Sequence, residues 1–183
     1  METVSHIILW ILVLMLTALS IQRKTQKTEM PMPKPMMLFQ SEHGAALGER
    51  FPITVFRSLD QEEIRIQEDG KHTILLITSP LCSACKELYP AIMPFVQKHG
   101  SAYRVVTIML DDAEHAQTLV KSHRITSPVV FLNKDELDKT ETKLYPFGYL
   151  LSPEGTVLSK GIVGNADQLE LLRTWKPSPG KAA

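Results

Sequence analysis

The sequence is poor in cysteine and carries no net charge. Only two of its 183 residues are cysteines, and 20 basic residues balance 20 acidic ones. Because a balanced chain creates no long-range field that attracts anions, nucleic acid is not an expected partner. The six histidines show no pair at the spacing of metal ligands, so a metal site would have to combine both cysteines with two distant histidines. We therefore expect no metal and no other cofactor.

Internal repeats and low-complexity blocks are also absent from the sequence. Hydrophobic residues make up 44% of the chain and charged residues 22%, as is normal for a folded globular protein and unlike a disordered one. The length suits one folded domain with an appendage.

Charge is missing altogether from Thr3 to Gln22, a run about as long as the ~20-residue helix that crosses a bilayer. A cleaved signal peptide is the alternative, but it would have basic residues before the apolar run, where Glu2 is the only formally charged side chain. No cysteine follows the run, which excludes a bacterial lipoprotein anchor. We expect a membrane anchor over residues 1–22 and a polar, proline-containing tether over residues 23–43.

A strand, a helix and a second strand follow one another in the middle of the chain. The run TILLIT, Thr73 to Thr78, is typical of a central strand buried on both faces. Beyond it, CKELYPAIMPFVQKHG has apolar residues at helical spacing, which predicts a helix that starts at or just before Cys85 and stops at Gly100. A second buried strand covers Arg104 to Leu110. A crossover of this length implies parallel strands in a right-handed βαβ unit.

Shorter elements flank this unit. Two extended stretches are expected at Pro52 to Arg57 and Glu63 to Ile66. The stretch AEHAQTLVKSH predicts a helix capped by the aspartate at 111 or 112. A short extended run and a charged helix are expected within SPVVFLNKDELDKTETKLYP. The stretch FGYLLSPEGTVLSKGI predicts a hairpin that turns near Gly155, and a final helix opens at Asn165.

Both cysteines lie in the stretch TSPLCSACKELYP, where the central strand meets the helix. Two residues three apart in a first helical turn face the same side, within reach of the ~5.5 Å Cα separation of a disulfide. Cys82 would lie at the positive end of the helix, where free N–H groups and the helix dipole stabilise a thiolate. We therefore predict that Cys82 attacks a disulfide of a partner and that the less accessible Cys85 resolves the mixed disulfide.

Other uses of the cysteine pair stay open on the residues alone. The two could form a structural disulfide or remain inert thiols in the core. A peroxidase of the peroxiredoxin type has a threonine and a proline upstream of its cysteine, but Ser79 and Leu75 occupy those places. A copper chaperone usually has a longer CxxxC spacing and a well-placed distal histidine, and neither is evident.

The order β-α-β-α followed by β-β-α, with CxxC at the first strand-to-helix junction, resembles the thioredoxin arrangement. Pro90 stands where that superfamily has a proline five residues after the second cysteine, and YPFGYLLSPEGTVLSKGIVG is similar to its pattern of Pro, apolar strand, Gly turn, strand and Gly. On these residues the chain resembles the membrane-anchored thioredoxin-like thiol–disulfide oxidoreductases of the TlpA and ResA kind, close to the methylamine dehydrogenase accessory proteins of the MauD group. The resemblance spans residues 44–175 and leaves residues 176–183 as a flexible tail.

This resemblance implies an α/β thioredoxin-like fold, with a central mixed sheet flanked by helices, behind an N-terminal transmembrane helix. It implies a membrane-tethered enzyme that uses Cys82 and Cys85 to reduce or exchange disulfides in a partner protein, in the maturation of a redox enzyme or cytochrome. Pro146 would be the cis-proline facing the active site and Tyr145 would pair with an extended substrate segment, whereas Pro128 is expected to be trans. The alternative is a non-enzymatic thioredoxin-like docking module at the membrane.

Three positions depart from the family pattern. Thioredoxins bury an acidic residue in the strand before the motif, where this chain has Leu76. Some cytochrome-maturation relatives have a glutamate three residues after the second cysteine, and that position is Leu88 here. Ser83-Ala84 replaces the more usual Gly-Pro or Glu-Pro pair, so the reduction potential does not carry over from relatives. The missing acid removes a familiar proton acceptor for Cys85 without removing the exchange chemistry.

Two indicators disagree on which side of the membrane the domain lies. Arg23, Lys24 and Lys27 follow the apolar run and no basic residue precedes it, which by the positive-inside rule would place the domain in the cytoplasm. The family resemblance implies a location outside the cytoplasm. We follow the resemblance, because three charges are a small sample for a statistical rule.

Overall fold

The computed structural model describes residues 6, 10, 11, 13–15 and 17 and then residues 42–58, 61–66, 69–110, 113–132 and 134–174. The chain divides into two units, Met1–Pro35 and Met36–Ala183. The described residues of the first unit are helical, and Trp10 and Leu14 are exposed. No helix within the described residues is long and apolar enough to cross a bilayer. Most of the expected anchor and almost all of the tether, like the tail after residue 174, lie outside the described residues.

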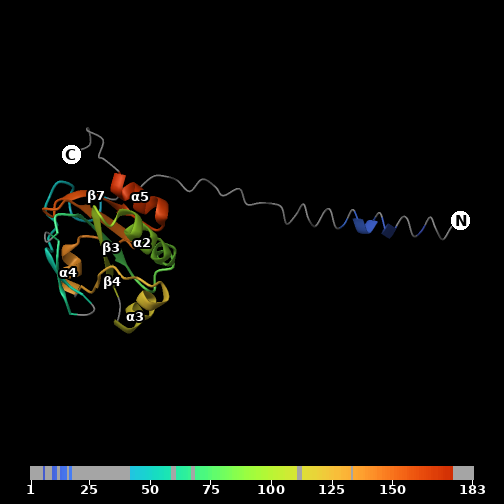
Figure 1. The fold of residues 1–183 in the computed structure, drawn as a ribbon, viewed down its shortest axis with the longest axis horizontal. Helices are drawn as coiled ribbons and strands as arrows, with labels where there is room; N and C mark the ends of the chain where they lie inside the picture. Colours follow the sequence, from blue (N-terminus) through green and yellow to red (C-terminus); the bar gives the residue numbers. More distant parts are fainter. Residues whose placement is uncertain are drawn as a thin grey trace. The chain divides into compact units, whose positions relative to one another are not determined.

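The second unit is built around a five-stranded mixed sheet (Figure 1). In spatial order its strands are β5 (Val129–Val130), β4 (Tyr103–Met109), β3 (His72–Thr78), β6 (Phe147–Leu151) and β7 (Val157–Ile162). β3 runs parallel to β4 and antiparallel to β6, and every residue from Thr73 to Thr78 is buried. The predicted central strand, its parallel neighbour and the hairpin formed by β6 and β7 are therefore confirmed.

Helices and a small hairpin complete the unit. The helices are α2 (Cys85–His99), α3 (Ala113–Ser122), α4 (Lys134–Lys139) and α5 (Ala166–Thr174), and the hairpin pairs β1 (Val55–Arg57) with β2 (Glu63–Arg65). Each matches an expected element. The expected cap at residues 111 and 112 lies outside the described residues.

Side chains that alternate along β3 belong to two hydrophobic cores, because successive residues of a strand point to opposite faces. Ile74 and Leu76 join the core beneath α2 and α5, whereas Leu75 and Ile77 join the core beneath residues 45–53 and the β1–β2 hairpin. The chain therefore folds as a sheet covered on both faces, and the cysteines belong to the first core.

The expected capping of the final helix is confirmed in a variant form. The Asn165 side-chain oxygen accepts a hydrogen bond from the Gln168 backbone N–H at 3.0 Å. The Gln168 side-chain oxygen accepts one in return from the Gly164 N–H at 2.7 Å, one residue earlier than in a standard capping box. These two bonds hold the loop before α5 in place.

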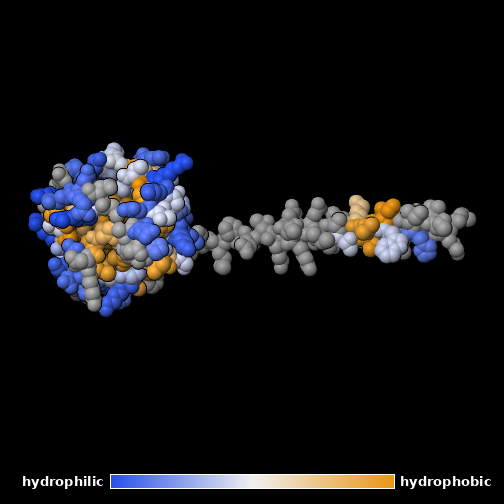
Figure 2. Space-filling view, turned by 90° about the horizontal axis from the view of Figure 1, so that it is seen from below, coloured by the Kyte–Doolittle hydropathy of each residue, from blue (hydrophilic) through white to orange (hydrophobic). Residues whose placement is uncertain are grey.

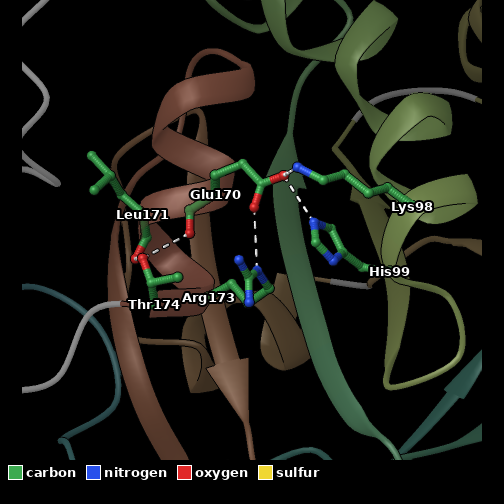
Figure 3. A network of polar contacts seen from close by, with 6 residues as sticks. All are labelled: Lys98, His99, Glu170, Leu171, Arg173 and Thr174. Carbon is green, nitrogen blue, oxygen red and sulfur yellow. Dashed lines mark hydrogen bonds and ion pairs between the residues drawn. The ribbon is translucent and has the colours of Figure 1, made fainter.

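Glu170 joins α5 to the last turn of α2 (Figure 3). One carboxylate oxygen accepts hydrogen bonds from Lys98 at 2.9 Å and His99 at 2.8 Å, and the other accepts one from Arg173 at 3.2 Å. Burial opposes ionisation of Glu170, but the bonds from Lys98, His99 and Arg173 outweigh it and hold the pKa of the carboxyl at about 2. The contacts of Glu170 with Lys98, His99 and Arg173 therefore depend on an ionised carboxylate.

The substitution Glu170→Gln should lower the free energy of unfolding at pH 7 by about 1 kcal/mol, a small value because a third of the side chain is exposed. The pKa of Glu170 is lower in the folded protein than its ordinary 4.5, so the stabilisation is complete above 4.5 and is lost as the pH falls toward 2. Urea unfolding of wild type and variant at several pH values measures this difference. A difference that stays constant down to pH 2 would contradict the role of the ionised carboxylate.

Candidate active site

The cysteine pair lies between the carboxyl end of β3 and the first residue of α2. Three backbone hydrogen bonds, each between residues three apart, lead the chain from the strand into the helix. The N–H of Cys82 donates to Ser79 O at 3.0 Å, that of Cys85 to Cys82 O at 3.1 Å and that of Lys86 to Ser83 O at 3.2 Å. The predicted helix start at Cys85 is confirmed, and Cys82 precedes the helix by three residues.

The two sulfur atoms differ in their surroundings. Cys82 is partly exposed, whereas Cys85 is fully buried. The Cys85 backbone N–H donates a hydrogen bond to the Cys82 Sγ at 3.3 Å. The sulfur of Cys82 thus faces a backbone donor near the start of the helix. Because it is the accessible sulfur of the pair, it is the one that can reach a partner disulfide.

Cys85 is held as a thiol. Burial, its hydrogen bond with the Cys82 side chain and the charge of Cys82 together raise the pKa of Cys85 to about 12, although the backbone at Ser79 acts in the opposite direction. A group with this pKa is protonated at neutral pH. It must lose its proton at the moment when it attacks another sulfur.

The loop before β6 faces the pair. The Tyr145–Pro146 peptide bond is cis and Pro146 is buried, so the predicted conformation is confirmed. The Cys82 thiol donates to the Tyr145 carbonyl oxygen at 3.8 Å. A Cβ atom placed on Gly164 would lie 3.7 Å from Pro146 Cγ and 3.9 Å from Ala84 O. The loop before α5 therefore meets both the cis-proline loop and the residues between the cysteines.

Two positions that depart from the family pattern carry apolar side chains in the core. Leu76 and Leu88 are fully buried and share the first hydrophobic core with Cys85.

Pro128 is trans, since the bond before Pro146 is the only cis peptide among the described residues. No three His, Cys, Asp or Glu side chains within the described part of the chain are grouped as metal ligands would be.

Leu81 lies next to Cys82 and is 77% exposed, the most exposed large apolar side chain of the second unit's described residues. Apolar surface on the face shown in Figure 2 is surrounded by hydrophilic residues. An exposed leucine beside a reactive sulfur offers apolar contact to an incoming protein segment. Sequence reasoning did not single out Leu81, although its position before the CxxC motif was visible.

No protein-family model matches the chain. Curated proteins with similar sequences include methylamine utilization proteins and a thiol-disulfide oxidoreductase. The methylamine utilization protein MauD of Methylophilus methylotrophus is 27% identical over 144 residues, which cover 75% of this chain and 66% of that protein. MauD of Paracoccus denitrificans is 24% identical over 174 residues and 85% of its length. The sporulation thiol-disulfide oxidoreductase A of Bacillus subtilis is 29% identical over 111 residues, or 57% of this chain and 67% of that protein.

Solved structures show the same fold. The crystal structure of StoA from Bacillus subtilis has a TM-score of 0.57 and 24% identity, and covers 70% of this chain and 99% of that one. A putative thiol:disulfide interchange protein DsbE from Chlorobium tepidum has a TM-score of 0.62 and 19% identity, and covers 70% and 94%. The solved structures show the thioredoxin-like fold, and the relatives MauD and sporulation thiol-disulfide oxidoreductase A support a thiol–disulfide oxidoreductase close to MauD.

Proposed function

We propose that the chain reduces or exchanges disulfide bonds of a partner protein through Cys82 and Cys85. The observation that carries this proposal is the asymmetry of the pair. Cys82 is partly exposed and accepts a hydrogen bond from the Cys85 N–H, while Cys85 is buried one turn further on. An accessible thiolate beside a protected thiol is the arrangement that two-step exchange needs.

The reaction proceeds through a mixed disulfide. The Cys82 thiolate attacks one sulfur of the partner, forming a Cys82–partner bond and releasing the partner's other sulfur as a thiolate, which takes a proton from solvent. Cys85 then loses its proton and attacks the Cys82 Sγ. The Cys82–Cys85 bond forms, the Cys82–partner bond breaks, and the second partner thiolate leaves. Two thiols of this chain are oxidised and one partner disulfide is reduced.

Tyr145 and Pro146 are proposed to hold the partner segment. The Tyr145 carbonyl oxygen lies 3.8 Å from the Cys82 Sγ, so the backbone of this loop is close enough to pair with an extended chain that brings its disulfide to Cys82. Leu81 would supply apolar contact on the exposed side. The relatives' names refer to methylamine utilization and sporulation, and the partner proposed for this chain is a redox enzyme or cytochrome during its maturation.

We further propose that residues 1–22 anchor the domain to the cell membrane and that the domain lies outside the cytoplasm. The uncharged run from Thr3 to Gln22 supports the anchor, and the resemblance to membrane-anchored thioredoxin-like proteins supports the location. A reporter that works only outside the cytoplasm, fused after Lys181, should be active. Activity of a reporter restricted to the cytoplasm would overturn the orientation.

The experiment that tests the exchange function equilibrates the protein in glutathione buffers and alkylates the remaining thiols. We expect a reversible disulfide between Cys82 and Cys85. If the two thiols were alkylated separately in every buffer, the dithiol mechanism would fail and the docking module would be the better explanation.

A further inference from the structure

Tyr89 is buried in α2, one helical turn after Cys85, and its hydroxyl has no assigned role in the exchange reaction. The side chain is fully buried. Among the described residues no group forms a hydrogen bond with its hydroxyl. Buried hydroxyls in native proteins are nearly always hydrogen-bonded, so an unpaired one calls for an explanation.

Tyr89 lies on the side of α2 that carries Cys85. Residues four apart on a helix are neighbours, and helical side chains lean toward the N-terminus, so Tyr89 extends toward Cys85. Both residues belong to the first hydrophobic core. Burial raises the pKa of Tyr89 to about 12, the Thr78 hydroxyl acts in the opposite direction, and the charges of Cys85 and Cys82 raise it further. The phenol therefore keeps its proton at neutral pH and can donate it in a hydrogen bond.

The polar neighbours leave this donor free. The Thr78 hydroxyl lies near the phenol and lowers its pKa, and its own proton is donated to Ile108 O at 3.3 Å. The imidazole of His123 packs against the phenol ring with centroids 5.6 Å apart. The titratable groups around Tyr89 are thus the two cysteines and His123.

When Cys85 must become a thiolate, the backbone at Ser79 favours that form, but no carboxylate occupies the positions usual for this fold. The places where relatives of this fold put a carboxylate are occupied by Leu76 and Leu88, both fully buried. A thiolate in an apolar core is unfavourable unless a hydrogen-bond donor reaches it. The phenol is a side-chain donor close to Cys85, in addition to the backbone at Ser79.

We propose that the Tyr89 hydroxyl donates a hydrogen bond to the Cys85 sulfur as that thiol loses its proton, and thereby speeds resolution of the mixed disulfide. This inference rests on the proposed exchange function. The phenol keeps its own proton, and the proton from Cys85 passes to solvent. The Cys82–Cys85 bond then forms as the Cys82–partner bond breaks, and the leaving partner thiolate takes up a proton from solvent. Tyr89 thus acts on the second step and not on the first.

The test follows the reduced full-length protein, in mild detergent, as it reacts with dithiobis(nitrobenzoate) in a stopped-flow instrument. This aromatic disulfide releases one coloured thiolate when Cys82 attacks and a second when Cys85 resolves the adduct. In Tyr89→Phe we expect an unchanged first phase and a second phase slower by about tenfold, the effect of losing a hydrogen bond to a charged group. The pH at which the second phase reaches half its maximal rate should rise.

Tyr149→Phe is the matched control. Tyr149 is also buried, but its hydroxyl donates to Thr140 O at 2.7 Å and accepts from the Ala45 N–H at 3.2 Å, in the core on the other face of the sheet. This variant should lose stability in urea and keep both phases, whereas Tyr89→Phe should not lose stability. Tyr89→Phe with both phases unchanged, or both slowed equally, would overturn the inference. A wild-type protein without a second phase would instead overturn the proposed function.

Discussion

The Cys85→Ser protein is expected to release one equivalent of thiolate from dithiobis(nitrobenzoate) and then stop, with the other half of the reagent bound to Cys82. The first step needs only Cys82, which is partly exposed and keeps the backbone N–H of residue 85 as a hydrogen-bond donor. The second step needs a sulfur at position 85, because a serine hydroxyl is not a nucleophile toward disulfides at neutral pH. Turnover with any disulfide should therefore fall to zero while the initial attack keeps its rate.

Mass spectrometry of the product detects the adduct and locates it on residue 82. Wild type treated in the same way should carry no adduct, because Cys85 resolves it. Release of two equivalents by Cys85→Ser would contradict the assignment of Cys85 as the resolving thiol.

The Cys82→Ser protein is expected to show the opposite behaviour. Its one remaining thiol, Cys85, is fully buried, and in the wild-type protein burial and the Cys82 side chain raise its pKa to about 12. Part of that rise comes from the Cys82 side chain, so the serine variant should keep a raised but smaller value. We expect the rate of attack on dithiobis(nitrobenzoate) to fall by at least about 10³-fold, as when an enzyme loses its nucleophile.

Unfolding the Cys82→Ser protein in urea provides the control, because Cys85 should then react as an ordinary exposed thiol. The ratio of unfolded to folded rates measures the protection that the fold gives to Cys85. Comparable rates in the two states would show that Cys85 is accessible, and the division of labour between the cysteines would be wrong.

Local sequence signals explain much of the agreement between prediction and structure. The run from Thr73 to Thr78 has no alternation of polar and apolar residues, and the strand is buried on both faces. Asn165 and Gln168 stand three apart before an apolar face, and they cap α5. The resemblance to a family added the cis bond at Pro146, which the residues by themselves did not require.

Contacts between distant segments could not be predicted in this way. Glu170 meets His99 across 71 positions in the sequence, and a single sequence has no signal for such a pairing. Gly44 has φ of +87°, and a Cβ atom there would lie 2.1 Å from the Tyr149 hydroxyl. The glycine is thus required by a residue far along the chain, and not by its own neighbours.

Tyr89 was missed for a related reason. A tyrosine four residues after Cys85 fits the apolar side of a helix, so the sequence pattern accounts for it as a core residue. Its importance depends on the unpaired hydroxyl and on the leucines at positions 76 and 88, which become meaningful only together. The spacing from Cys85 was the available signal.

The measurement that tests the central claim most directly is the reduction potential of the Cys82–Cys85 pair, read by alkylation after equilibration in glutathione buffers. Our account predicts a single two-electron transition that involves both cysteines. A value near or below about −270 mV would identify a reductant, and a value near about −120 mV an oxidant that installs disulfides. Failure of Cys82 and Cys85 to form a disulfide with each other in any buffer would contradict the account.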